Sequence, residues 1–157
     1  VALAVPLYRQ LRALRGAVLA TVTAIIVGSL TAIASALGIA WALGGTVETL
    51  VSLAPKSVTT PIAMALSDRL GGLASLTAVA VIITGMVGAI AGGWLLDRFR
   101  ITDQRARGVA IGVAAHGIGT ARAFQVNETA GAFAGLAMGL NALATTLFFA
   151  AAIAWFG

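Results

Sequence analysis

The sequence predicts an all-α fold: a polytopic bundle of transmembrane helices that includes broken or re-entrant helices. Hydrophobic residues make up 60% of the chain and charged residues 10%, whereas soluble domains average about 45–50% apolar and about 25% charged residues. Three stretches, 17–43, 71–96 and 131–156, contain no charged residue, and each exceeds the roughly 20 residues that cross a hydrocarbon core. A spanning backbone must satisfy its own hydrogen bonds, so these stretches are expected to be helices.

The remaining composition narrows the class further. The chain contains no cysteine, so neither disulfides nor thiol chemistry is expected. Its net charge of +5 comes from arginines beside the apolar stretches; these are topology signals, and nucleic-acid binding is not expected without a basic soluble face. The chain opens in an apolar segment without Met. We therefore expect residues 1–157 to form one transmembrane domain that belongs to a longer protein.

The first full span is predicted at 17–43. Three arginines at a spacing of three precede it and share one face of a helix end: Arg9, Arg12 and Arg15. The span ends at Gly44 and Gly45, because paired glycines break a helix.

The next segment, 49–66, is predicted to be broken or re-entrant. It is apolar at both ends, but Pro55 and Pro61 in its middle each remove an amide and disturb the preceding turn. Thr60 directly before Pro61 is typical of a helix N-cap followed by proline in the first helical position. The pattern predicts two short helices with a break at 55–60.

The second half of the chain is predicted to hold two full spans around a broken one. The span 71–96 carries small residues that permit close helix packing, at Gly85, Gly88, Gly92 and Gly93. A compact charged loop follows at 97–107, and 108–126 is a broken span because glycines interrupt its apolar sequence. The last span, 131–156, has glycines every four residues that predict a packing stripe: Gly131, Gly135 and Gly139.

The distribution of arginines predicts the topology. Basic residues gather in cytoplasmic loops, which places both the arginines at 9–15 and the loop 97–107 inside. The two loops agree only if 49–66 enters and returns on the outer side. We therefore expect a re-entrant hairpin at 49–66 and an outer position for the loop at 44–48.

Two groups of polar residues lie in the broken segments. The first contains Lys56, Ser57, Thr59 and Thr60 between two prolines. A lysine at membrane depth is costly and rarely faces lipid, and hydroxyls beside a helix N-terminus are suited to an anion. The alternative is that Lys56 extends to the interface and the hydroxyls only satisfy the broken backbone.

The second group contains the only histidine of the chain: His116, Gly117, Gly119, Thr120 and Arg122. Its two glycines favour unwinding, Thr120 is expected to cap a new half-helix, and broken helices hold substrates in many transporters. His116 would bind a substrate or carry a proton, and Arg122 would hold a carboxylate. Alternatively, His116 only satisfies a neighbouring carbonyl and Arg122 pairs with Glu128.

No catalytic set or metal site is visible. The histidine has no serine and carboxylate partners at a recognisable spacing. The five acidic residues are all expected in loops or at helix ends: Glu48, Asp68, Asp97, Asp103 and Glu128. Neither an enzyme nor a cofactor is therefore expected.

Several strings of residues resemble the LrgB family, also called CidB/LrgB. They occur in the family's order at 1–11 (VALAVPLYRQL), 55–64 (PKSVTTPIAM), 75–89 (SLTAVAVIITGMVGA), 106–124 (ARGVAIGVAAHGIGTARAF) and 131–140 (GAFAGLAMGL). The resemblance implies that the chain corresponds to the C-terminal two-thirds of such a protein, with one half of an inverted-repeat carrier fold.

The resemblance also implies two functions. Bacterial members are described as antiholin-like regulators of murein hydrolase export and lysis that act with an LrgA-type membrane partner. The plant relative is a chloroplast-envelope translocator of glycolate and glycerate, and some bacterial pairs are linked to pyruvate.

Our leading hypothesis is a multi-pass carrier of small 2-hydroxy or 2-oxo monocarboxylates in the bacterial inner membrane, with the substrate held at the helix breaks. The alternative is an antiholin-like regulator. The expected partners are the carboxylate anion, the lipid bilayer, an LrgA-type protein and a second copy of this chain that covers its apolar surfaces.

Overall fold

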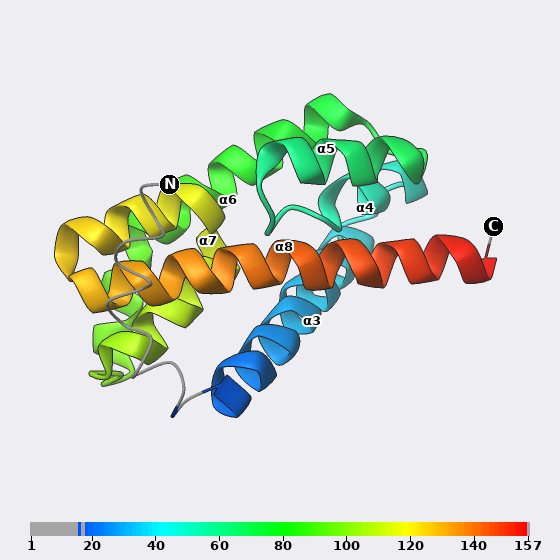
Figure 1. Cartoon of the computed structure of the whole chain (residues 1–157). Coiled ribbons are helices and arrows are strands. Elements are labelled where there is room, and N and C mark those ends of the chain that lie inside the picture. Colours follow the sequence, from blue (N-terminus) through cyan, green and yellow to red (C-terminus); the bar gives the residue numbers. More distant parts are fainter. Residues whose placement is uncertain (1–15, 17, 157) are drawn as a thin grey trace.

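The computed structural model describes residue 16 and residues 18–156, and it confirms the expected all-α class (Figure 1). The described residues form six α-helices and no strand. The helices are α3 (Val18–Ala42), α4 (Val47–Leu53), α5 (Thr60–Arg69), α6 (Ala74–Arg98), α7 (Gln104–Val126) and α8 (Glu128–Phe156). The arginines at 9, 12 and 15, and the first residue of the expected span 17–43, lie outside the described residues.

Three of the described helices are long and apolar enough to cross a membrane. They cover Val18–Ala42, Ala74–Arg98 and Glu128–Ala152. Large apolar side chains point away from the protein, including Leu19, Ile90 and Trp155, which are each more than four-fifths exposed. In a bilayer such side chains face hydrocarbon, because lipid tails are as apolar as leucine. Of the three segments, that of α8 is 44% buried, against 17% for the other two, which makes α8 the central helix.

Helices α4 and α5 form a hairpin. Thr46 caps α4, and its hydroxyl accepts a hydrogen bond from the Thr49 amide. The chain then turns at 54–59, which we call the first tip, and α5 returns along α6. The N-cap of α5 is Thr59, whereas the sequence predicts Thr60. The difference is one residue, because proline fits anywhere in a first turn whose amides lack intrahelical acceptors.

Helix α7 is also a hairpin, which differs from the span expected at 108–126. His116 has φ 39° and ψ −132°, outside the helical region. A Cβ atom built on Gly119 would lie 2.9 Å from Cγ2 of Ile111, although eight residues span about 12 Å of a straight helix. The two halves, 104–115 and 117–126, therefore lie against each other. The reversal occurs at His116, which we call the second tip, and the glycine at 119 supplies the room for close packing.

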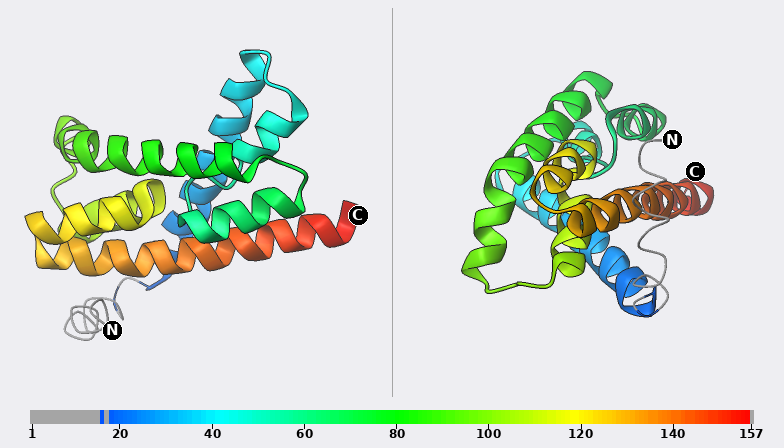
Figure 2. Two further views of the ribbon diagram at one scale, coloured as in Figure 1. Left: turned by 90° about the horizontal axis from the view of Figure 1, so that it is seen from above. Right: turned by 60° about the vertical axis from the view of Figure 1, so that its left-hand side comes forward.

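Both hairpins pack along helix α8 (Figures 1 and 2). Its first half packs against α7, where Gly108 and Gly112 approach the backbone of Ala130 and Ala134. Its second half reaches the first hairpin, where Phe149 packs with Ala54 and Leu66.

The expected glycine stripe on α8 contributes to this seam at Gly131 but not at Gly139. Gly131 packs against Phe124, but a Cβ atom on Gly139 would meet nothing within 4 Å. Close approaches are thus made by Gly108 and Gly112 of α7 and by Gly131 of α8, because a helix needs a small residue where the partner backbone arrives.

The two hairpins enter from opposite ends of the molecule. The basic end, residues 98–107, holds four arginines: Arg98, Arg100, Arg105 and Arg107. Helix α6 finishes there and both halves of α7 open toward it, whereas α4 and α5 open toward the opposite end (Figure 2). The rule on basic loops predicts that the basic end is cytoplasmic.

The basic end is held by two ion pairs. Arg107 bonds Asp97 at 2.5 Å and the carbonyl of Ile101 at 3.0 Å. Asp103 caps α7 through the amide of Arg105. Hydrogen bonds from the Arg105 side chain lower the pKa of Asp103 to about 2, so this cap stays ionised at physiological pH.

Candidate functional site

The tips of the two hairpins meet beside the middle of α8, at Asn141. The Nδ2 atom of Asn141 donates to the carbonyl of Ser57 in the first tip at 3.0 Å. It also donates to the carbonyl of Val113, just before the second tip, at 3.4 Å. Asn141 is 1% exposed. One buried amide therefore joins segments that are 84 and 28 residues away in the sequence.

The same amide is anchored from the far side by α3. The hydroxyl of Ser29, in the middle of α3, donates to Oδ1 of Asn141. This hydroxyl also lies 2.6 Å from the carbonyl of Ile25. The site is thus built from mid-helix positions of two long helices together with two tips.

His116 occupies the second tip and is buried, with 4% of its surface exposed. Its Nε2 atom lies 2.9 Å from the carbonyl of Val81 on α6. Because a carbonyl only accepts, Nε2 carries the proton. Gly85 makes room for the ring, since a Cβ atom there would lie 2.7 Å from Cε1 of His116. The structure thus contains the carbonyl contact that was the alternative role for His116. In the neutral ring, Nδ1 is then the nitrogen without a proton.

The other residues of the second group do not all lie at the tip. Gly117 begins the second half of α7 at the tip. Thr120 does not cap this half-helix: it lies within the helix and its hydroxyl donates back to the carbonyl of His116 at 2.7 Å. Arg122 is exposed and donates to Oε1 of Gln125 at 3.1 Å. The structure does not bring Arg122 to the tips, because six helical residues carry it about 9 Å along the axis.

The first group lies together in the first tip. Ser57 is buried, whereas Lys56, Thr59 and Thr60 are half-buried. The two groups are joined through Asn141, which bonds the carbonyl of Ser57 and, three residues before His116, that of Val113. The five acidic residues of the chain all lie at the ends of the molecule, in or beside the connections between helices. Lys56 is therefore the charged side chain of the described residues that lies at the tips.

The helix ends at the tips determine the remaining electrostatics. Helix α5 and the second half of α7 both begin at a tip, and a helix N-terminus presents free amides and partial positive charge. Helix α4 and the first half of α7 end there with partial negative charge. Asn141 donates to carbonyls of both tips, so part of the negative ends is covered.

Comparison with known proteins identifies the family. Residues 1–155 match the LrgB-like family. The chain belongs to this family. It is 41% identical over 146 residues to "Uncharacterized protein YwbG" of Bacillus subtilis, an alignment that covers 92% of this chain and 64% of that protein. It is 31% identical over 147 residues to "Antiholin-like protein LrgB" of Bacillus mycoides, covering 94% of this chain and 64% of that protein.

A Haemophilus influenzae protein is also similar to this LrgB-like chain, with 35% identity over 147 residues that cover 94% of the chain and 64% of that protein. The chain thus spans a little under two thirds of the length of these relatives. No solved structure matches it. Together with its three membrane-crossing helices, family membership makes this an integral membrane protein.

Sequence reasoning missed two residues of the site in this LrgB-like chain, Asn141 and Ser29. Both lie within charge-free runs that were interpreted only as spans. A polar amide in the middle of a transmembrane segment is costly unless it is bonded, and this signal was present at Asn141. Ser29 offered a weaker signal, because serine readily bonds the carbonyl of its own helix.

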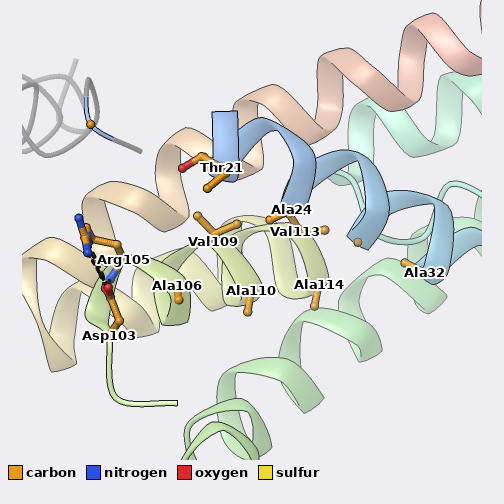
Figure 3. A pocket seen from close by; sticks show the side chains of 13 residues that line it. Thr21, Ala24, Ala32, Asp103, Arg105, Ala106, Val109, Ala110, Val113 and Ala114 are labelled. Atoms are coloured by element: carbon orange, nitrogen blue, oxygen red, sulfur yellow. Dashed lines mark hydrogen bonds and ion pairs between the residues drawn. The ribbon is translucent and has the colours of Figure 1, made fainter. Parts of the chain in front are cut away.

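An apolar groove of about 640 Å³ lies between α3 and the first half of α7, and it runs from the basic end to Ala114. Its walls are small residues of both helices, such as Ala24, Ala110 and Ala114, and the ion pair of Asp103 and Arg105 closes one end (Figure 3). Its lining offers few polar atoms to an anion. The groove is therefore shaped for apolar chains rather than for a carboxylate.

Proposed function

We propose that this chain forms the substrate-handling core of a membrane carrier for small 2-hydroxy or 2-oxo monocarboxylates of the glycolate, glycerate and pyruvate type. The observation that carries the proposal is the meeting of two helical hairpins from opposite ends, with Lys56 at their tips and the acidic side chains elsewhere. Broken helices whose N-termini point at an anion are a recurring way to bind carboxylates at the midplane of transporters.

Each part of the substrate has a partner in this proposal. Lys56 neutralises the carboxylate, together with the amides at the start of α5 and at Gly117. The hydroxyls of Ser57, Thr59, Thr60 and Thr120 surround the second oxygen, and Nδ1 of His116 accepts from a substrate hydroxyl or carries a proton. Gly119 contributes by letting the second hairpin close. Arg122 has no part in this site, since it is exposed.

The test is uptake by sealed vesicles that contain the full-length parent protein. Labelled glycolate, glycerate and pyruvate are each offered with and without a pH gradient. We expect saturable uptake of at least one of them. Absence of uptake in vesicles where helical folding and orientation have been verified would overturn the carrier proposal.

We propose as a second candidate an antiholin-like regulator of murein hydrolase export and lysis in the bacterial inner membrane, acting with an LrgA-type protein or as a homodimer. The observation in its favour is the name of relatives such as "Antiholin-like protein LrgB" of Bacillus mycoides. These names support regulation more directly than they support transport. The exposed apolar faces of α3 and α6 would then contact a partner as well as lipid.

The two candidates are separated by a variant that cannot bind the anion. We expect Lys56→Gln to remove uptake, and if lysis control depends on transport, the same cells will also lose normal lysis timing. A variant without uptake that still restores normal lysis to a deletion strain would favour the regulator. The measurement is optical density during antibiotic-induced lysis, beside vesicle uptake from the same strains.

A further inference from the structure

We propose that Asn141 is a positioning residue: it holds the tips of the two hairpins together and covers their carbonyls, so that helix N-termini face the space between them. The positional part of this inference stands on the geometry alone. Only its consequence for anion selection rests on the proposed carrier function.

The orientation of the amide follows from its neighbours. The carbonyls of Ser57 and Val113 can only accept hydrogen bonds, so Nδ2 must face them. A turned amide would place Oδ1 against two other oxygens. In the observed orientation Oδ1 accepts from the Ser29 hydroxyl, whose single proton is shared with the carbonyl of Ile25.

The carbonyls that Asn141 covers lie where helical segments stop or turn. The last four carbonyls of a helix lack intrahelical amides, and the first half of α7 ends at the reversal at His116. The carbonyl of Val113 is one of these four. That of Ser57 lies in the turn between α4 and α5. A buried carbonyl without a partner is costly, so removing Nδ2 should release both tips together.

The experiment measures the distance between the hairpins. Residues 1–157 contain no cysteine, so Ala65→Cys on α5 and Ala121→Cys on α7, both exposed, accept spin labels at defined positions. The full-length protein is reconstituted in nanodiscs and the distance distribution is recorded by pulsed electron resonance. Asn141→Asp keeps the size of the side chain and loses both donors.

We expect Asn141→Asp to broaden the distance distribution and to shift it to longer distances. The control is Thr146→Val on the same helix, whose hydroxyl bonds only its own helix at Ala142, and it should match the parent. An unchanged distribution in a folded Asn141→Asp protein would overturn the inference. If that variant does not fold, Asn141→Leu carries the test, because it also removes both donors but places no carboxylate against the two carbonyls. A broadened distribution supports the inference, and an unchanged one overturns it.

Transport is read separately. We expect the KM for glycolate to rise about tenfold in Asn141→Asp, which corresponds to the loss of roughly one good hydrogen bond. If Asn141→Asp widens the distance distribution but the parent protein transports nothing, the carrier proposal is wrong and the positional role stands. If Asn141→Asp leaves the distribution unchanged and the parent transports normally, the positional role is wrong and the carrier proposal stands.

Discussion

Replacing Lys56 with Gln is expected to lower glycolate uptake by about ten- to a hundredfold, the range of a lost charge-assisted hydrogen bond. Lys56 is half-buried at the first tip, which Asn141 joins to the second tip. Glutamine keeps a donor and much of the length but cannot neutralise a carboxylate. Uptake is measured in vesicles with matched amounts of inserted protein.

Two basic residues provide matched controls for Lys56. Arg122→Gln removes an exposed guanidinium bonded to Gln125, and Arg69→Gln removes one at the end of α5. Both should retain uptake near that of the parent, in contrast to the role that the sequence predicts for Arg122. Loss of uptake in Arg122→Gln with normal uptake in Lys56→Gln would move the carboxylate site away from the tips.

Replacing Gly112 with Ala is expected to destabilise the protein by about 1–3 kcal/mol, the usual effect of overpacking. A Cβ atom there would lie 2.2 Å from the carbonyl oxygen of Ala134 and 2.8 Å from its Cα atom. Because the obstacle is backbone, α7 and α8 must move apart. The free energy of unfolding is measured by denaturant titration in mixed micelles.

Gly139→Ala is the control for this change. It lies on α8, and a Cβ atom would meet nothing within 4 Å. Alanine favours a helix over glycine by about 0.8–1.0 kcal/mol, so the control should be equal to or slightly more stable than the parent. Equal stability of Gly112→Ala and Gly139→Ala would show that the seam between α7 and α8 is looser than described.

The break at 54–59 illustrates what local sequence can predict. Pro55 and Pro61 act within one turn of their own positions, so two short helices followed directly from them, and only the N-cap moved by one residue. The outer entry of this hairpin was predicted from the arginine count and stays a prediction about orientation. The reversal at the second tip was harder to predict from the sequence, because Gly117 and Gly119 indicate that the chain can turn there but not by how much.

The sequence by itself determined the class of this protein. Charge-free runs longer than a bilayer core admit few folds other than helices, because the backbone has no other hydrogen-bond partner there. The motifs were enough to indicate the LrgB family, which the match over residues 1–155 then established. They also located both polar groups.

Only the tertiary structure decided which of these residues share a site. Hydropathy is summed along the chain and contains no information on sharp reversals, so α7 was expected to cross rather than to double back at His116. Asn141 looked like one polar residue in an apolar helix, because its role depends on carbonyls that are 84 and 28 residues away. Arg122 was excluded for the same reason: proximity in sequence brought it near His116, but helical geometry turned it outward.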